Sequence, residues 1–334
     1  MGFEDIVRQR TSTDLLKESA RSATFEDQWA HPTELQFGNE RADLYDVKPE
    51  EVKRETPLMI VPGWGATPER FKENIRTVVS AGRRALSVDS PHGVSHDIEV
   101  PAYMEQVPET ELRRIAAFME GLNVAGVDKT SAVGHSQGGL DLALAAAMYP
   151  ERFRAIALVD PAGMIGSDTM LPLAARFTWD QIKALIGSAR DGTLKERLRI
   201  TSEATPILMG HPKQSWDQVR TLASANIMQL LGYIKSQGVG IVVIHGVDDA
   251  AFPMQRVQGQ TEATIREGAG KGLEQRSPER IDKIAEEFLD GFVSVKGTHN
   301  DFVVHAPEYT RIAEGLLTAI EDKQDKARAV ESNP

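Results

Sequence analysis

Short, mostly apolar runs alternate along this chain with segments whose apolar residues recur at helical spacing. The runs cover residues 58–61, 85–88, 131–133, 155–159, 241–244 and 292–295. One intervening segment carries Phe71, Ile75 and Val78 three or four positions apart, behind a Thr-Pro-Glu start at 67–69. Strands buried on both faces have continuous apolar runs, and helices that cover a sheet have one apolar face. The alternation therefore predicts a mostly parallel sheet with helices on both faces.

Two regions depart from this alternation. Residues 34–37 and 42–45 are strand candidates separated by Gly38-Asn39, a turn signal that predicts a hairpin. From 164 to 238 helical periods replace the strand pattern, and one apolar stripe there predicts a longer helix. The stripe consists of Trp216, Val219, Ala223, Ile227, Leu230 and Ile234. The predicted division is a core of 33–163 and 239–322, a helical insertion at 164–238, an N-terminal extension at 1–32 and a charged tail at 323–334.

The strongest chemical signal is a glycine-bracketed serine at the junction of a strand and a helix. Gly134-His135-Ser136-Gln137-Gly138 follows the run at 131–133 and precedes a leucine- and alanine-rich helical segment. In the Gly-x-Ser-x-Gly nucleophile elbow, a sharp turn holds the serine at strained backbone angles, and neighbours without a Cβ relieve the crowding. The alternative for so short a pattern is an ordinary glycine-containing turn.

A carboxylate and an imidazole follow two later strand candidates. The run at 241–244 leads into Asp248 and Asp249, and the run at 292–295 leads into His299. A serine hydroxyl is a poor nucleophile at neutral pH, so a histidine must take its proton and a carboxylate must orient that histidine. The chain order serine, aspartate, histidine is the order expected for a triad on such a sheet.

With these motifs in place, the chain resembles the α/β-hydrolase superfamily from about residue 33 to about 320. Pro62-Gly63-Trp64-Gly65 resembles the family's oxyanion loop, although proline replaces a common histidine. Asp89-Ser90-Pro91-His92-Gly93-Val94-Ser95 resembles a family turn, one residue short, and Tyr149-Pro150-Glu151-Arg152-Phe153 resembles the segment behind the nucleophile helix. The resemblance implies an eight-stranded, mostly parallel sheet with a helical cap inserted after the sixth strand.

The same resemblance implies roles for individual residues. Ser136 would be the nucleophile, Asp249 the acid and His299 the base, and the backbone N–H groups of Trp64 and Gln137 would form the oxyanion hole. Three rivals stay open, namely Asp248 and Asp160 as the acid and His305 as the base. Geometry has to decide among them.

Substrate contacts are expected from the cap and from the oxyanion loop. The candidates are the Trp64 side chain and Met164, Met170, Phe177 and Met209. Methionines fill irregular apolar gaps, so the alternative for them is the core of the cap itself.

Composition argues against several classes of function but does not identify a reaction. A net charge of −11 argues against a nucleic-acid partner, and the absence of cysteine excludes disulfides and thiolate metal sites. The first 30 residues have no apolar core typical of a secretory signal, and no apolar run is long enough to span a membrane, so the cytoplasm is the expected location. His92, His96 and Asp97 have metal-ligand spacing, but a turn there argues against a metal.

The sequence thus predicts a cofactor-independent serine hydrolase that cleaves carboxylic esters of apolar acyl groups through an acyl-enzyme. A thioesterase, a lactonase or a carbon–carbon bond hydrolase with the same triad is the alternative within the resemblance. A ligand receptor without catalytic activity is the alternative from another class. No oligomeric state is predicted.

Overall fold

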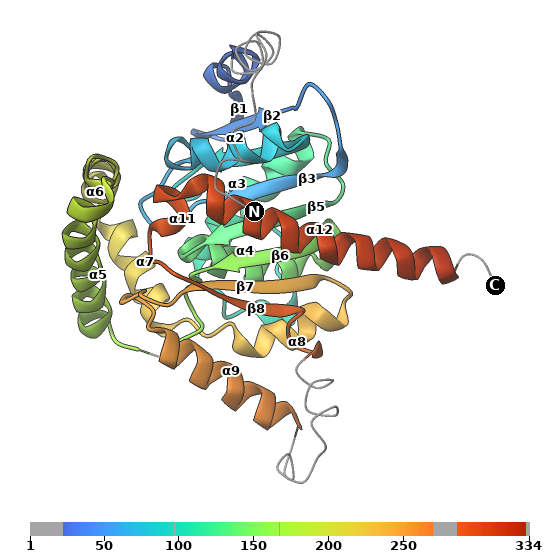
Figure 1. Cartoon of the computed structure of the whole chain (residues 1–334). Coiled ribbons are helices and arrows are strands. Elements are labelled where there is room, and N and C mark those ends of the chain that lie inside the picture. The colour runs from blue at the N-terminus through green and yellow to red at the C-terminus, as the bar shows by residue number, and fades with distance from the viewer. Residues whose placement is uncertain (1–22, 96–97, 167, 270–285, 332–334) are drawn as a thin grey trace, which may run out of the picture.

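The computed structural model describes residues 23–95, 98–166, 168–269 and 286–331 around one central sheet (Figure 1). Its eight strands lie in the order β1-β2-β4-β3-β5-β6-β7-β8. They are β1 (Thr33–Phe37), β2 (Glu40–Val47), β3 (Arg54–Val61), β4 (Arg83–Asp89), β5 (Thr130–His135), β6 (Phe153–Val159), β7 (Gly240–Gly246) and β8 (Gly291–Val295). β2 runs antiparallel to β1 and β4, and all other neighbours are parallel. The mostly parallel sheet and the hairpin at Gly38-Asn39 are confirmed.

Helices connect the strands and cover both faces of the sheet. They are η2 (Pro68–Phe71), α2 (Lys72–Ser80), η3 (Ala102–Met104), α3 (Glu109–Val124), α4 (Gln137–Met148), η4 (Pro150–Arg152), α5 (Met170–Asp191), α6 (Leu194–Gly210), α7 (Pro212–Ser224), α8 (Met228–Ser236), α9 (Met254–Ala269), α11 (Asp301–Val304) and α12 (Ala306–Glu331).

Alternation along β3 shows how the sheet forms two cores. Leu58 and Ile60 belong to the core under α2 and α12, whereas Met59 and Val61 belong to the core under α3, α4 and α8. Successive side chains of a strand point to opposite faces, so a strand covered on both sides must be apolar throughout. This is why the central strands have continuous apolar runs.

A buried polar cluster fastens α12 to the sheet. The guanidinium of Arg83, on β4, is fully buried and pairs with the carboxylate of Glu321, on α12. Ser131 Oγ, on β5, donates to the same Glu321 carboxylate at 2.5 Å. A buried charge needs such partners, because an unpaired one would be strongly destabilising.

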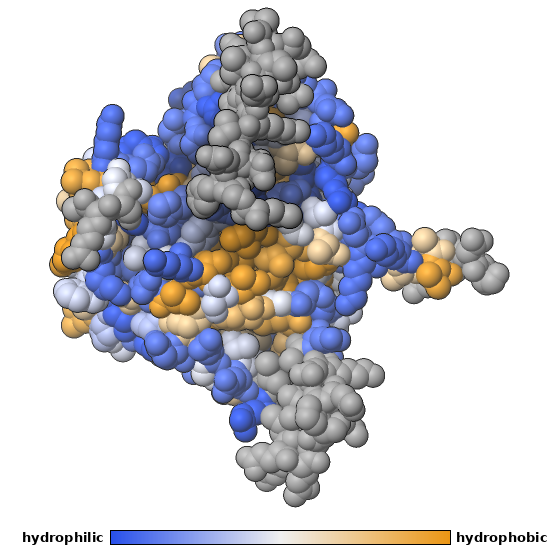
Figure 2. Space-filling view, viewed as in Figure 1, coloured by the Kyte–Doolittle hydropathy of each residue, from blue (hydrophilic) through white to orange (hydrophobic). Residues whose placement is uncertain are grey.

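The helices α5, α6 and α7 stand beside the carboxyl ends of the strands, at the left of Figure 1. The outward face of α5 is apolar, with Leu171, Trp179, Ile182 and Ile186 exposed, and Figure 2 shows apolar side chains over α5 and α6 on this side. Helix α8, by contrast, packs on α4 and β7. The predicted insertion at 164–238 therefore includes a helix that lies against the sheet, and its exact limits stay a prediction.

The long helix predicted from the stripe at 216–234 is two helices in the structure. Ala225 takes an extended conformation (φ −62°, ψ 140°), and the N–H of Ile227 donates to the carbonyl of Gly163 at 3.0 Å. Asn226 Oδ1 accepts the N–H of Met228 at 3.1 Å and so supports the start of α8. The single-helix prediction was wrong because apolar periodicity does not register such a local side-chain hydrogen bond.

Candidate active site

Ser136 lies on the turn between β5 and α4 with a positive φ of 57° and a ψ of −119°, a combination that residues with a side chain rarely adopt. The neighbouring glycines make this turn possible. A Cβ on Gly134 would lie 2.3 Å from the carbonyl oxygen of Gly138, and a Cβ on Gly138 would lie 2.1 Å from the carbonyl oxygen of Val61. Only residues without a side chain fit here, so the two glycines of the pattern have a steric reason.

Three predicted residues meet at this turn although 113 and 50 positions separate them along the chain. Ser136 Oγ is 2.9 Å from His299 Nε2, and His299 Nδ1 is 2.9 Å from Asp249 Oδ2. The second oxygen of Asp249 accepts the N–H of Phe252 at 2.9 Å. All three side chains are buried, with Ser136 only 4% exposed. A hydroxyl, an imidazole and a carboxylate in this chain of contacts have the geometry that activates a serine.

Electrostatics around His299 favour its protonated form. Burial alone would lower its pKa, but the charge and hydrogen bond of Asp249 raise the pKa of His299 to about 9. Burial opposes ionisation of Asp249 as well, yet His299 keeps the pKa of Asp249 below its usual range. The carboxylate therefore stabilises the imidazolium that forms when the serine loses its proton.

The rival residues occupy other positions. The side chain of Asp248 is exposed, and His305 makes no side-chain hydrogen bond among the described residues. Asp160 is fully buried and accepts the N–H of Gly246 at 2.7 Å, and burial raises the pKa of Asp160 well above its usual value. Asp249 is thus the carboxylate that hydrogen-bonds His299.

The loop after β3 packs directly against the serine turn. A Cβ on Gly63 would lie 2.9 Å from the carbonyl oxygen of His135 and 3.1 Å from Ser136 Cβ. Trp64 and Gln137 therefore come from two segments in contact beside Ser136. The indole Nε1 of Trp64 is buried and has no hydrogen-bond partner in the described part of the chain.

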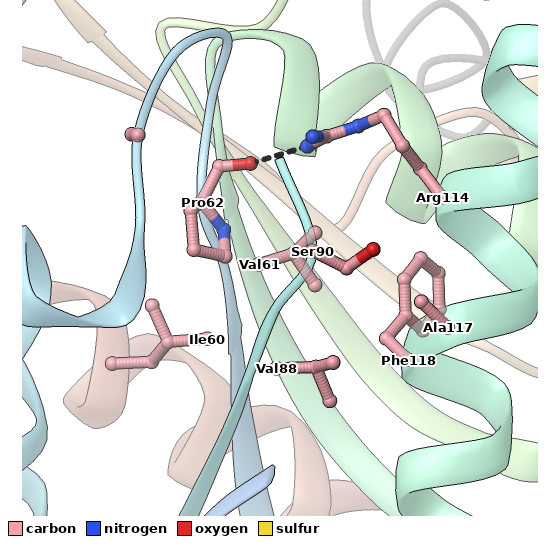
Figure 3. A pocket seen from close by; sticks show the side chains of 9 residues that line it. Ile60, Val61, Pro62, Val88, Ser90, Arg114, Ala117 and Phe118 are labelled. Atoms are coloured by element: carbon pink, nitrogen blue, oxygen red, sulfur yellow. Dashed lines mark hydrogen bonds between the residues drawn. The ribbon is translucent and has the colours of Figure 1, made fainter. Parts of the chain in front are cut away.

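Arg114, on α3, ties these segments together. Its guanidinium donates to the carbonyls of Pro62 and Pro91 and to the carboxylate of Asp141, on α4, at 2.7–2.8 Å. Figure 3 shows Arg114 reaching Pro62 across a cavity behind the loop, which Ser90 and Phe118 also line. Sequence reasoning missed Arg114, because an arginine inside a helical pattern carries no signal of what it contacts.

The four predicted cap residues divide into different environments. Phe177 stands edge-on to the His299 ring, with centroids 5.1 Å apart. Met164 is fully buried in the core, Met170 packs on the edge of that core, and Met209 is 73% exposed. Of the predicted cap residues, Phe177 is therefore the one placed beside a triad residue by a ring contact. A residue not predicted, Leu208 on α6, lies over the loop after β3, with its Cδ2 3.0 Å from the position of a Cβ on Gly65.

Histidines and aspartates gather here as two groups with donor atoms within 4.8 Å, one of His135, Asp160 and His299 and one of Asp160, His245 and Asp249. The buried Nδ1 of His245 has no hydrogen-bond partner among the described residues and lies 3.3 Å from Asp160 Oδ1. His299 uses both nitrogens within the triad, His135 Nε2 donates to the His299 carbonyl, and His245 Nε2 donates to the Phe252 carbonyl. In the segment whose spacing resembles metal ligands, and where no metal is expected, His92 Nε2 donates to the carbonyl of Ile207 at 3.1 Å, and His96 and Asp97 lie outside the described residues.

Comparisons with known proteins identify the fold. A family model described as alpha/beta hydrolase fold matches residues 56–309. A carboxylesterase structure from the thaumarchaeon Nitrososphaera gargenis aligns with a TM-score of 0.58 at 15% identity, covering 87% of this chain and 100% of the other. A bromoperoxidase from Bacillus anthracis aligns at 0.57 and 15% identity, with 86% and 100% covered. A thermophilic esterase from Thermogutta terrifontis aligns at 0.55 and 15% identity, with 87% and 99% covered.

A search of curated protein sequences gives no significant match. Within the described ranges, no helix has the length and apolar character needed to cross a membrane.

Proposed function

Because this chain belongs to the α/β-hydrolase family, we propose that it is a serine hydrolase that cleaves carboxylic esters of apolar acyl groups. The observation that carries the proposal is the continuous set of contacts from Ser136 through His299 to Asp249, each at 2.9 Å. Carboxylesterases among the similar structures fit an ester substrate.

The proposed reaction has two stages, formation of an acyl-enzyme on Ser136 and hydrolysis of that acyl-enzyme. Ser136 Oγ attacks the ester carbonyl carbon while its proton passes to His299 Nε2, and the new oxyanion accepts hydrogen bonds from the N–H groups of Trp64 and Gln137. The tetrahedral intermediate then collapses, the alkoxide leaves with the proton from His299, and the acyl group stays on Ser136. Water, deprotonated by His299, attacks the acyl-enzyme by the same route and releases the acid.

The surroundings of the triad favour an apolar acyl group. Phe177 and Phe252 stand edge-on to the His299 ring, and Leu208 lies over the oxyanion loop. An apolar lining strengthens the electrostatic contacts made to the oxyanion, because it excludes water. Ser136 is 4% exposed, so a substrate has to reach it from among these apolar side chains.

The test is covalent labelling followed by turnover. A fluorescent fluorophosphonate should label Ser136, the Ser136→Ala variant should not react, and mass spectrometry should place the label. A panel of esters of increasing acyl length, with thioesters, lactones and diketones beside them, then defines the reaction. Turnover of thioesters or diketones alone would overturn the ester assignment. Ligand-induced stabilisation without labelling or turnover would favour a receptor.

A further inference from the structure

One face of α5 rests on the loop that presents the catalytic carboxylate, here called the acid loop (residues 248–252). Arg176 Nε donates to the carbonyl of Ala251 at 3.1 Å, and Lys183 Nζ donates to the carbonyl of Asp248 at 3.3 Å. Phe177, on the same face, stacks edge-on against both Phe252 and His299. Residues three and four apart on a helix share a face. The contacts of Arg176, Phe177 and Lys183 therefore place the acid loop against one face of α5.

Asp180 lies at the centre of this face and is fully buried. Its Oδ1 accepts the backbone N–H of Ala250 at 2.9 Å, and Oδ2 has no hydrogen-bond partner among the described residues. Burial, with the charge of Asp249, raises the pKa of Asp180 above its usual value, although His299 and the N–H of Ala250 act in the opposite direction. Burying a carboxylate destabilises the folded protein unless hydrogen bonds or charges around it compensate for the lost hydration.

That hydrogen bond joins α5 to the acid loop at the residue next to Asp249. Asp249 Oδ1 accepts the N–H of Phe252, which closes a tight turn, and Asp249 Oδ2 faces His299 Nδ1. The N–H of Ala250 is on this turn, next to Asp249 itself. Without Asp180 a backbone donor beneath α5 would lose its partner, at the point where the turn aims Asp249.

We propose that Asp180 is a positioning residue that holds the acid loop in register with His299, so that the triad depends on a helix of the predicted cap. The inference rests on the proposed function, because it concerns the same triad. Asp180 acts through Asp249 and does not touch the reacting atoms. Misplacing a catalytic group by about 1 Å can cost about 10²-fold in rate.

The experiment compares three substitutions at this position with a matched control. Asp180→Ala removes the acceptor, Asp180→Asn keeps an acceptor oxygen without the charge, and Asp180→Glu keeps the charge but moves the oxygen. Asp217→Ala, on α7, removes an aspartate whose side chain makes no hydrogen bond among the described residues. Each is measured by kcat and KM on the best ester, by thermal unfolding, and by the downfield proton resonance of the His299–Asp249 hydrogen bond.

Positioning predicts that Asp180→Ala and Asp180→Glu lower kcat about 10²-fold with little change in KM, and weaken the downfield resonance. Asp180→Asn should restore most of kcat, and Asp217→Ala should resemble the wild type. If Asp180→Ala does not fold, Asp180→Glu decides. Folded variants that keep kcat and the resonance would overturn the proposal. Should wild-type protein fail to label at Ser136, the proposed function fails, and the resonance still tests Asp180 separately.

Discussion

Gly138 is where the nucleophile helix comes closest to the proposed oxyanion loop. A Cβ there would lie 2.1 Å from the carbonyl oxygen of Val61 and 2.7 Å from that of Pro62, well inside the 3.4 Å at which ordinary contact begins. Both obstacles are backbone atoms, so Gly138→Ala must push the loop and the helix apart by more than 1 Å. The donors of Trp64 and Gln137 lie on these two segments.

The expected magnitude follows from that displacement. Loss of one oxyanion donor costs about 2.7–4 kcal/mol of barrier, which is about 10²–10³ in kcat. Overpacking should also lower the free energy of unfolding by about 1–3 kcal/mol. We therefore expect Gly138→Ala to stay folded at moderate temperature but to lose at least about 10²-fold in kcat, with a smaller change in KM.

The assay pairs steady-state ester hydrolysis with urea unfolding. Gly259→Ala is the matched control, because Gly259 is exposed on α9 and a Cβ there would meet nothing within 4 Å. That control should gain about 0.5–1 kcal/mol of stability and keep wild-type kcat. A folded Gly138→Ala protein with kcat within about twofold of the wild type would refute the assignment of the oxyanion donors.

Four further predictions concern the triad and the core. Asp249→Asn should lower kcat about 10⁴-fold in a folded protein, because an amide holds His299 in the wrong tautomer. Wild-type kcat/KM should rise with pH around the His299 pKa of about 9, because the base must be neutral, and steady-state profiles measure this. The folded-state pKa of His299 is above the usual 6.5, so protonation of His299 stabilises the folded protein below pH 6.5. This stabilisation should be lost as the pH rises through about 9. Urea unfolding of the wild type and of His299→Gln at several pH values measures it. Glu321→Gln should cost about 3–5 kcal/mol in urea unfolding without changing kcat, because Arg83 loses its buried partner.

Neighbouring residues supply the controls for these predictions. Asp248→Asn changes an exposed side chain beside Asp249 and should leave kcat unchanged. Asp322→Asn removes a solvent-exposed pair with Arg54 and should lower the free energy of unfolding much less than Glu321→Gln does. Equal losses of kcat in Asp248→Asn and Asp249→Asn would contradict the choice of acid. Equal losses of stability in Glu321→Gln and Asp322→Asn would contradict the expectation that a buried ion pair contributes more to stability than an exposed one.

The hairpin and the parallel sheet could be predicted because their signals are local. Gly38 has a positive φ of 62°, which the turn needs, and the strands of the sheet are apolar on both faces. The break between α7 and α8 could not be predicted, because Ile227 continues the apolar stripe while its N–H bonds to Gly163, more than 60 residues earlier. Periodicity describes which side of a helix is apolar, and it does not describe where a distant backbone group ends that helix.

The candidate site also has features set by local sequence and features set by contacts between distant residues. Sequence alone determined the serine turn, since Gly134 and Gly138 are required by contacts within a few residues or with the adjoining strand, and it determined the order serine, aspartate, histidine. Only the tertiary structure decided which carboxylate faces His299, because folding gives Asp160 and Asp180 backbone N–H partners, leaves Asp248 exposed and places Asp249 against His299 Nδ1. It also decided that Asp180 of α5 supports the acid loop. Hydrogen bonds join atoms about 3 Å apart. The number of residues between two positions in the chain does not tell whether folding brings their atoms within that distance.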